Sequence, residues 1–102
     1  MDIHYEFNKI VFVWDEEKAW KNQIKHQGIS FEKAVEAFFD PFLIFVDASR
    51  NFENRDGIIG KTATQQLLFV VHIQFENDYI RIISARKATG DEKSLYYEHQ
   101  YP

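Results

Sequence analysis

The sequence predicts an α+β fold in which two N-terminal helices and a short C-terminal helix pack on a small antiparallel sheet. Helical periodicity occurs before residue 41 and again after residue 90, whereas strand periodicity occupies most of the chain between them. Helices and strands segregated in this way indicate a layer of helices on an antiparallel sheet. The chain has 102 residues and no internal repeat or linker, so we expect a single domain over residues 1–102.

The first helix is predicted from its start signal and its periodicity. A short apolar strand, Ile10–Val13, comes before Asp15, which suits the N-cap position, and Gly28 ends the helix. The side that we expect to be buried carries Ala19, Trp20, Gln23 and Ile24. The side that we expect to face solvent carries Lys18, Lys21, Asn22, Lys25 and His26.

A second helix follows directly. Ser30 is placed as its N-cap, and Asp40-Pro41 ends it because proline cannot continue a helix. The residues at positions i, i+3, i+4 and i+7 are Phe31, Ala34, Val35 and Phe38. We therefore expect this helix to be buried along that stripe.

Apolar runs and alternation predict the strands of the sheet. These are Phe42–Val46, Ile58–Ile59, Leu67–Phe75 and Tyr79–Ala85. The segment Glu76-Asn77-Asp78 is typical of a hairpin turn. Asp91 starts the closing helix, and His4 and His99 are expected near loose chain ends.

Composition excludes several classes of protein. The chain has no cysteine, which excludes a disulfide scaffold, a cysteine nucleophile and a thiolate metal site. Its longest apolar runs are far shorter than the roughly 20 residues of a membrane span, so we expect a soluble, intracellular protein. The net charge of −4 argues mildly against nucleic-acid binding. Seventeen aromatic residues exceed what a small core needs, and the surplus suits a protein interface.

Two basic clusters are open to more than one interpretation. Lys18, Lys21 and Lys25, with His26 at the end, form either a solvated helix face or a row that follows a phosphate backbone. Arg81 and Arg86 lie in an apolar strand, so each either pairs with a carboxylate or binds an anion. Strand alternation puts these two arginines on opposite faces unless a bulge intervenes.

Motifs for a metal or a cofactor are missing from the sequence. The four histidines show no metal-ligand spacing, and the chain contains no Gly-rich phosphate loop, nucleophile elbow or dinucleotide fingerprint. We therefore expect neither a metal site nor a cofactor.

Two blocks of the sequence resemble the BrnT toxins over about residues 10–97. The first block contains Trp14-Asp15, Lys18, Asn22 and Lys25-His26, followed by Ser30-Phe31-x-x-Ala34 and Asp40-Pro41. The second contains Arg55 before Ile58-Ile59-Gly60, then Ile80–Thr89 with Glu92 and Tyr96. The blocks are long and correctly spaced, so the resemblance is specific.

The resemblance implies the toxin half of a type II toxin–antitoxin pair, with a fold similar to the RelE-type ribonucleases. Such a toxin cleaves RNA in the cytoplasm and stops translation. A BrnA-type antitoxin neutralises it, in an expected heterotetramer of two toxin and two antitoxin chains. The antitoxin binds operator DNA through a ribbon-helix-helix part, so that the complex represses its own operon.

The same resemblance, together with the chemistry of the residues, indicates which side chains are catalytic and which bind RNA. Metal-independent RNA cleavage requires loss of a proton from the ribose 2′-OH, stabilisation of the phosphorane charge and protonation of the leaving 5′ oxygen. The expected catalytic residues are Arg86 as phosphate clamp, Lys25 as charge stabiliser, His26 as proton carrier and Glu92 as a weaker candidate for that role. The expected RNA contacts are Lys18, Lys21, Arg55, Arg81 and Lys87.

Two alternatives stay open. Gly90-Asp91 and Asp56-Gly57 depart from the residues expected of the family, and with the acidic net charge they indicate weaker RNA binding, as in a slow, selective or inactive toxin. The alternative function is therefore a non-catalytic toxin that acts only as the antitoxin's binding partner. On residue chemistry alone, the Arg81–Lys87 strand could also belong to a small anion-binding domain.

Overall fold

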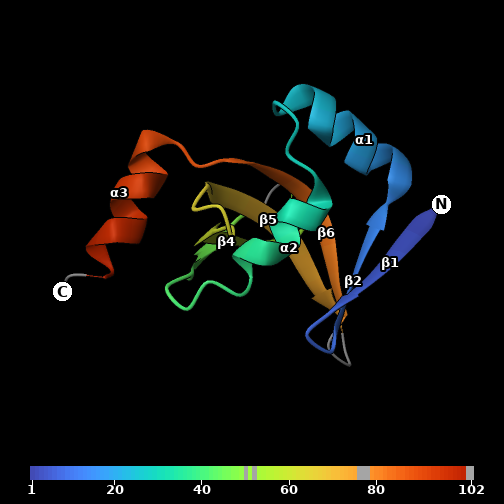
Figure 1. The fold of residues 1–102 in the computed structure, drawn as a ribbon, viewed down its shortest axis with the longest axis horizontal. Helices are drawn as coiled ribbons and strands as arrows, with labels where there is room; N and C mark the ends of the chain where they lie inside the picture. The colour runs from blue at the N-terminus through green and yellow to red at the C-terminus, as the bar shows by residue number, and fades with distance from the viewer. Residues whose placement is uncertain (50, 52, 76–78, 101–102) are drawn as a thin grey trace.

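The computed structural model describes residues 1–49, 51, 53–75 and 79–100. Within these residues the chain forms one six-stranded mixed sheet and three helices (Figure 1). The strands lie in the order β1-β2-β6-β5-β4-β3. None of the helices among the described residues has the length and apolar character needed to cross a membrane.

The sheet begins with a strand that the sequence interpretation missed. β1 (Asp2–Phe7) pairs antiparallel with β2 (Ile10–Asp15) through a tight turn at Asn8 and Lys9, whose φ angles are 51° and 67°. Positive φ at both central residues matches the turn type that suits the twist of a two-residue hairpin. The expectation of a loose end around His4 is therefore wrong.

The predicted small antiparallel sheet is also wrong. β2 runs parallel to β6 (Tyr79–Lys87), with Val11 opposite Tyr79 and Val13 opposite Arg81. Parallel strands need a long crossover connection, and here the whole segment from α1 to β5 lies between them in sequence. Periodicity within a segment does not reveal such a distant pairing, so the sheet is larger and mixed rather than small and antiparallel.

The remaining strands lie close to the predicted segments. They are β3 (Ile44–Asp47), β4 (Asp56–Lys61) and β5 (Leu67–Phe75), with antiparallel pairing from β3 through β6. β5 has the predicted bounds, and β4 and β6 extend beyond the predicted ones. The turn predicted at residues 76–78 lies outside the described residues.

Helices α1 (Glu16–Lys25) and α2 (Phe31–Ala37) cover one face of the sheet (Figure 1). The predicted caps are confirmed, because Asp15 accepts from Lys18 N and Ser30 accepts from Lys33 N. Three residues of the stripe predicted for α2 are fully buried, namely Phe31, Ala34 and Val35. The stripe therefore lies in the main core, beside Phe12 and Trp14 from β2.

The predicted buried side of α1 is largely wrong. Trp20 and Ile24 are 62% and 64% exposed, whereas Asn22, expected to face solvent, is 7% exposed. Of the residues expected on the inner side, Ala19 is buried. The helix thus turns a polar amide towards the sheet and two large apolar side chains away from it.

The third helix lies apart from the first two. α3 (Gly90–Glu98) begins with a capping box between Thr89 and Glu92. Its residue Tyr96 is 1% exposed and packs in a second cluster with Ile59, Leu67 and Ala88. α3 therefore packs on a cluster separate from the main core, and in Figure 1 it lies to the left of the sheet, apart from α1 and α2.

Candidate functional site

The face of the sheet that α1 and α2 do not cover carries a hollow of about 510 Å³, which we call the cationic hollow. Its lining residues are Lys25, His26, Ala48, Ser49, Arg55, Phe69, Val71, Ile83, Ser84 and Arg86. They come from the end of α1, the connection between β3 and β4, and the strands β5 and β6. Four of the nine candidate residues, remote in sequence, therefore line one hollow.

A β-bulge decides how the arginines of β6 are oriented. The pairing of β5 with β6 shifts by one residue between Val71 and His72, which leaves Ile83 as the extra residue in β6. Arg81 and Arg86 are five residues apart, but the bulge restores them to the same face of the sheet. The bulge that the sequence analysis named as the exception to opposite faces is therefore present.

Arg86 is held in a fixed orientation on this face. Its Nη1 and Nη2 donate to the two carboxylate oxygens of Glu92 at 2.7 and 2.9 Å, and Nη1 also donates to the Lys87 carbonyl at 3.2 Å. The guanidinium carbon lies 4.5 Å from the centre of the Phe69 ring. A forked ion pair and a cation–π contact therefore orient a cation that remains about one third exposed.

Glu92 serves the helix and the arginine at once. Its Oε1 accepts from Thr89 N at 2.8 Å as well as from Arg86. Burial raises the pKa of Glu92, but the hydrogen bonds from Arg86 and Thr89 outweigh it, and the net pKa lies below the ordinary value. Glu92 is therefore ionised at neutral pH.

Lys25 and His26 lie at the end of α1, beside Arg86. Together with Gln27 and Lys87 they also line a smaller recess of about 190 Å³. Burial, then the positive charges of Lys25 and Arg86, lower the pKa of His26 below its ordinary value. Its imidazole is therefore neutral at pH 7 and able to accept a proton. Lys25 has no carboxylate partner in the described part of the chain.

Arg55 approaches the cationic hollow from the β3–β4 connection. Its Nη2 lies 2.6 Å from Glu53 Oε2, and its backbone N–H donates to Ser49 Oγ at 3.3 Å. Its Nε is buried without a hydrogen-bond partner among the described residues. A buried donor without a partner is costly, so this atom is suited to meeting a ligand in the hollow.

Three other candidates lie elsewhere. Arg81 donates through Nη2 to Asp2 Oδ2 at 2.6 Å, next to the β1 edge, and does not line the cationic hollow. Lys18 and Lys21 are exposed on α1, outside the hollow, and Lys21 lies 3.1 Å from Glu17. The structure thus favours the carboxylate-pairing interpretation for Arg81.

The residue that sequence reasoning missed is Asn22. Its amide nitrogen donates to Ala85 O at 2.9 Å and Ile29 O at 3.1 Å, and its amide oxygen accepts from Ala85 N at 3.1 Å. Helical periodicity placed it on the solvent side, and no pattern within α1 indicates a partner 63 residues away. Its position in the Lys18-x-x-x-Asn22-x-x-Lys25 spacing was the available signal.

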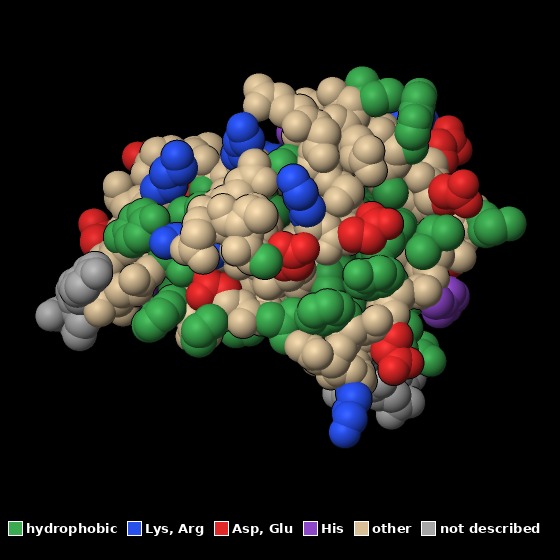
Figure 2. Space-filling view, viewed as in Figure 1, with side chains coloured by type: hydrophobic (Ala, Val, Ile, Leu, Met, Phe, Trp, Pro, Cys, Tyr) green, Lys and Arg blue, Asp and Glu red, His purple; other side chains and the backbone are tan. Residues whose placement is uncertain are grey.

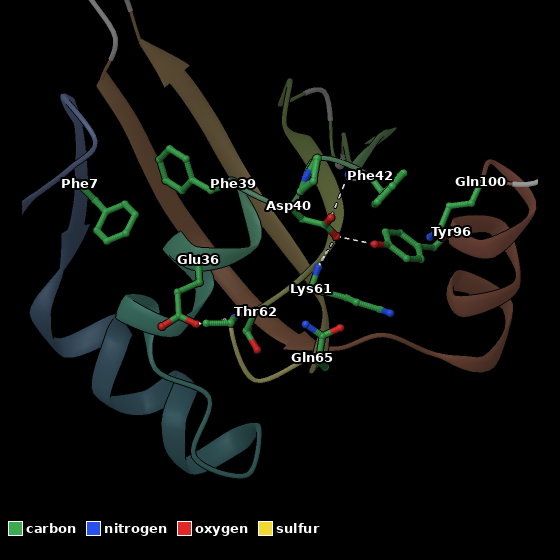
Figure 3. A pocket seen from close by; sticks show the side chains of 12 residues that line it. Phe7, Glu36, Phe39, Asp40, Phe42, Lys61, Thr62, Gln65, Tyr96 and Gln100 are labelled. Carbon is green, nitrogen blue, oxygen red and sulfur yellow. Dashed lines mark hydrogen bonds between the residues drawn. The ribbon is translucent and has the colours of Figure 1, made fainter.

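A second hollow, of about 490 Å³, lies away from these residues. Figure 3 shows it between Phe7 and Phe39 on one side and Phe42 and Tyr96 on the other. Asp40 is its hub, because its carboxylate accepts from the Tyr96 hydroxyl at 2.5 Å and from the backbone N–H of Lys61 at 2.8 Å (Figure 3). None of the nine candidate residues lines it.

The molecular surface also differs in character from the cationic hollow. On the face shown in Figure 2, hydrophobic side chains form a band from α3 towards β1, with charges of both signs mixed above it. Among the described residues, no three or more acidic, histidine or cysteine side chains form a group able to hold a metal ion. The cationic hollow contains instead the guanidinium groups of Arg55 and Arg86, the ammonium of Lys25 and the neutral imidazole of His26, which together can bind phosphate and move a proton.

A hollow with this lining suits a phosphate-bearing ligand. The family model of the ribonuclease toxin BrnT, of type II toxin–antitoxin systems, matches residues 14–92 of this chain. The chain belongs to that family, and a type II system implies an antitoxin partner. No curated protein matches the sequence. The matched range contains every candidate residue, and it also contains Asn22.

Proposed function

We propose that this protein is a metal-independent endoribonuclease toxin that cleaves RNA in the cytoplasm and so inhibits translation. The observation that carries the proposal is the convergence of Lys25, His26 and Arg86 on one hollow in a chain of the BrnT family. Their combination of fixed positive charge and a neutral imidazole supports phosphodiester chemistry without a metal ion.

The reaction is an internal transesterification. The neutral imidazole of His26 takes the proton of a ribose 2′-OH while the 2′ oxygen attacks the adjacent phosphorus. The bond between phosphorus and the 2′ oxygen forms, the bond to the 5′ oxygen breaks, and the leaving oxygen gains a proton from the imidazolium or from water. The products are a 2′,3′-cyclic phosphate and a 5′-hydroxyl end.

Arg86 and Lys25 stabilise the charge that develops on the phosphorane. Arg86 binds two phosphate oxygens by exchanging the Glu92 carboxylate for the phosphate, since both are matched by the same fork. Until then Glu92 positions Arg86 through the forked ion pair, and its lowered pKa makes it a poor proton donor. Arg55 and Lys87 guide the RNA around the site, and Lys18, Lys21 and Arg81 contact only RNA that extends beyond the hollow.

We further propose that the partner is a BrnA-type antitoxin, in a heterotetramer of two toxin and two antitoxin chains that represses its own operon. The exposed side chains of Trp20 and Ile24 support a protein interface on α1. Large apolar residues at such exposure, tryptophan above all, are typical of interface anchors.

One observation favours a second candidate function, a non-catalytic toxin that binds only its antitoxin. Arg55, Arg81 and Arg86 are each ion-paired with a carboxylate of their own chain. An RNA phosphate has to compete with all three, in a protein whose net charge is −4.

Cleavage of a defined RNA separates the two functions. The purified chain is incubated with end-labelled RNA in EDTA, beside Lys25→Ala, His26→Ala and the control Lys33→Ala, at an exposed lysine of α2 outside the hollow. We expect cyclic-phosphate ends from the wild type and from the control, and a loss of about 100-fold in both site variants. The wild-type cleavage rate should fall in acid, because protonation of His26, whose pKa lies below its ordinary value, removes the base. The pH–rate profile of His26→Ala should lack this fall.

Intact RNA with folded wild-type protein, together with normal growth when the chain is induced in a bacterial host, would contradict the nuclease. The non-catalytic function would then explain the paired arginines. Cleavage that stops with EDTA would contradict only the metal independence.

A further inference from the structure

The edge of β6 has an unusual neighbour at Ala85. β2 pairs with β6 only from Tyr79 to Arg81, because Trp14 and Asp15 at its end pair with β1 and the chain then enters α1. Beyond that point a sheet edge exposes backbone N–H and C=O groups that need partners. Asn22 supplies both, since its oxygen accepts from Ala85 N and its nitrogen donates to Ala85 O. The Asn22 amide thus makes the two hydrogen bonds to Ala85 that a neighbouring strand would otherwise make.

The same amide also binds the turn that follows α1. Its nitrogen has a second hydrogen, which goes to the Ile29 carbonyl in the turn after α1. Asn22 is 7% exposed, so these three bonds form away from solvent and are costly to leave unmade. The end of α1, the following turn and the end of β6 are therefore joined at one side chain.

The link joins the helix that ends at Lys25 and His26 to the strand that carries Arg86. Ala85 immediately precedes Arg86, and Asn22 lies one helical turn before Lys25 and His26. The backbone N–H of His26 also donates to the Asn22 carbonyl at 2.9 Å. Movement at the Asn22–Ala85 contact thus changes the separation of the proton carrier from the phosphate clamp.

We propose that Asn22 is a positioning residue, whose amide sets the distance of Lys25 and His26 from Arg86 and so makes RNA cleavage possible. The cleavage part rests on the proposed function, whereas the geometric part does not. Displacements of about 1 Å between reacting groups can cost about 100-fold in rate, so a small shift of α1 is enough.

The chemistry of the contact explains why an amide is needed. A donor and an acceptor must face the N–H and the carbonyl of the same residue. An aspartate would place an anionic oxygen against the carbonyls of Ala85 and Ile29, and an alanine would leave all three backbone groups without a partner. A glutamine carries the same amide on an arm longer by one methylene.

The test compares Asn22→Ala with Val35→Ala, which removes buried volume from α2 in the main core but takes no part in the three Asn22 hydrogen bonds. Both are measured below their melting temperatures. The first readout is the NMR titration of His26, with His72 as an internal reference. In Asn22→Ala the pKa of His26 should rise towards its ordinary value, because burial and Arg86 lower it in the native arrangement. In Val35→Ala it should stay unchanged.

The second readout is the cleavage of labelled RNA. Asn22→Ala should lose about 100-fold in kcat with little change in KM, and Val35→Ala should stay within about threefold. Native His26 titration and native kcat in Asn22→Ala would overturn the proposal. If Asn22→Ala fails to fold, Asn22→Gln replaces it, and it must shift the His26 titration and lower kcat, or the proposal falls. A wild type without cleavage refutes the nuclease, while the His26 titration still decides the positioning.

Discussion

The two ends of β6 carry the same residue type on the same face of the sheet, and yet they have different surroundings. Arg81 lies among strands, where β2 runs alongside and Asp2 of β1 neutralises it. Arg86 lies where β2 has left the sheet, between the ends of α1 and α3. One end of the strand is closed by the sheet, and the other is open to a ligand.

The difference shows what makes an arginine available to an anion. Both side chains are paired with a carboxylate and both are about one third exposed. Only Arg86 has Lys25 and His26 beside it, because Asn22 substitutes for the missing strand and brings α1 to that end. The neighbours, rather than the arginine itself, distinguish a structural ion pair from a candidate site.

Replacing each arginine gives the largest expected contrast. Arg86→Ala should lower kcat/KM for RNA about 100-fold or more, because it removes charge stabilisation at the reacting phosphate. Arg81→Ala should stay within about threefold in the same assay. Far-UV circular dichroism of both variants checks that they are folded. Equal losses in the two variants would refute the assignment of different roles.

The second contrast compares two adjacent tyrosines of α3, the helix that begins beside Arg86. Tyr96→Phe removes the hydroxyl that donates to Asp40 and should lower the free energy of unfolding by about 1.5–3 kcal/mol, the range for hydrogen bonds to charged groups. Tyr97→Phe, at a 42% exposed ring, should change it by less than about 0.5 kcal/mol. Urea denaturation measures both. A matching loss in Tyr97→Phe would show that the Asp40 bond is not what holds α3.

The smallest effect is expected from neutralising the carboxylates. Glu92→Gln keeps an oxygen for the capping box but frees Arg86, so binding of a 2′-deoxy oligonucleotide should tighten about three- to tenfold. Asp2→Asn, at the Arg81 end, should change it less than about twofold. Fluorescence anisotropy measures both affinities. Lost cleavage without tighter binding in Glu92→Gln would instead make Glu92 a proton carrier.

Local chemistry made much of the fold predictable. Capping at Asp15 and Ser30, the apolar stripe of α2 and the alternation in β5 all depend on residues a few positions apart, and the structure agrees with each. Ile3, Tyr5 and Phe7 alternate with polar residues in β1, but terminal residues are ordered only when another segment holds them, and the pairing with β2 does so here. The parallel pairing of β2 with β6 joins segments too distant for any periodicity to show.

The candidate site divides in the same way. Lys25 and His26 were placed together by the end of one helix, and Arg86 was placed at the end of a strand. Their meeting at one hollow depends on a bulge at Ile83 and on a buried amide, and neither has a local signature. Trp20 and Ile24 show the converse, since an apolar pair at helical spacing predicts burial but here faces solvent.

By itself, the sequence determined the caps, most of the strands and the residue types of the candidate site, since these follow from backbone geometry and side-chain chemistry within a few residues. The tertiary structure alone decided which face of α1 is buried, which arginine meets the helix and which remains in the sheet. These outcomes depend on hydrogen bonds over more than sixty residues, such as Asn22 to Ala85, where the demand of a buried backbone for partners outweighs local apolar preference.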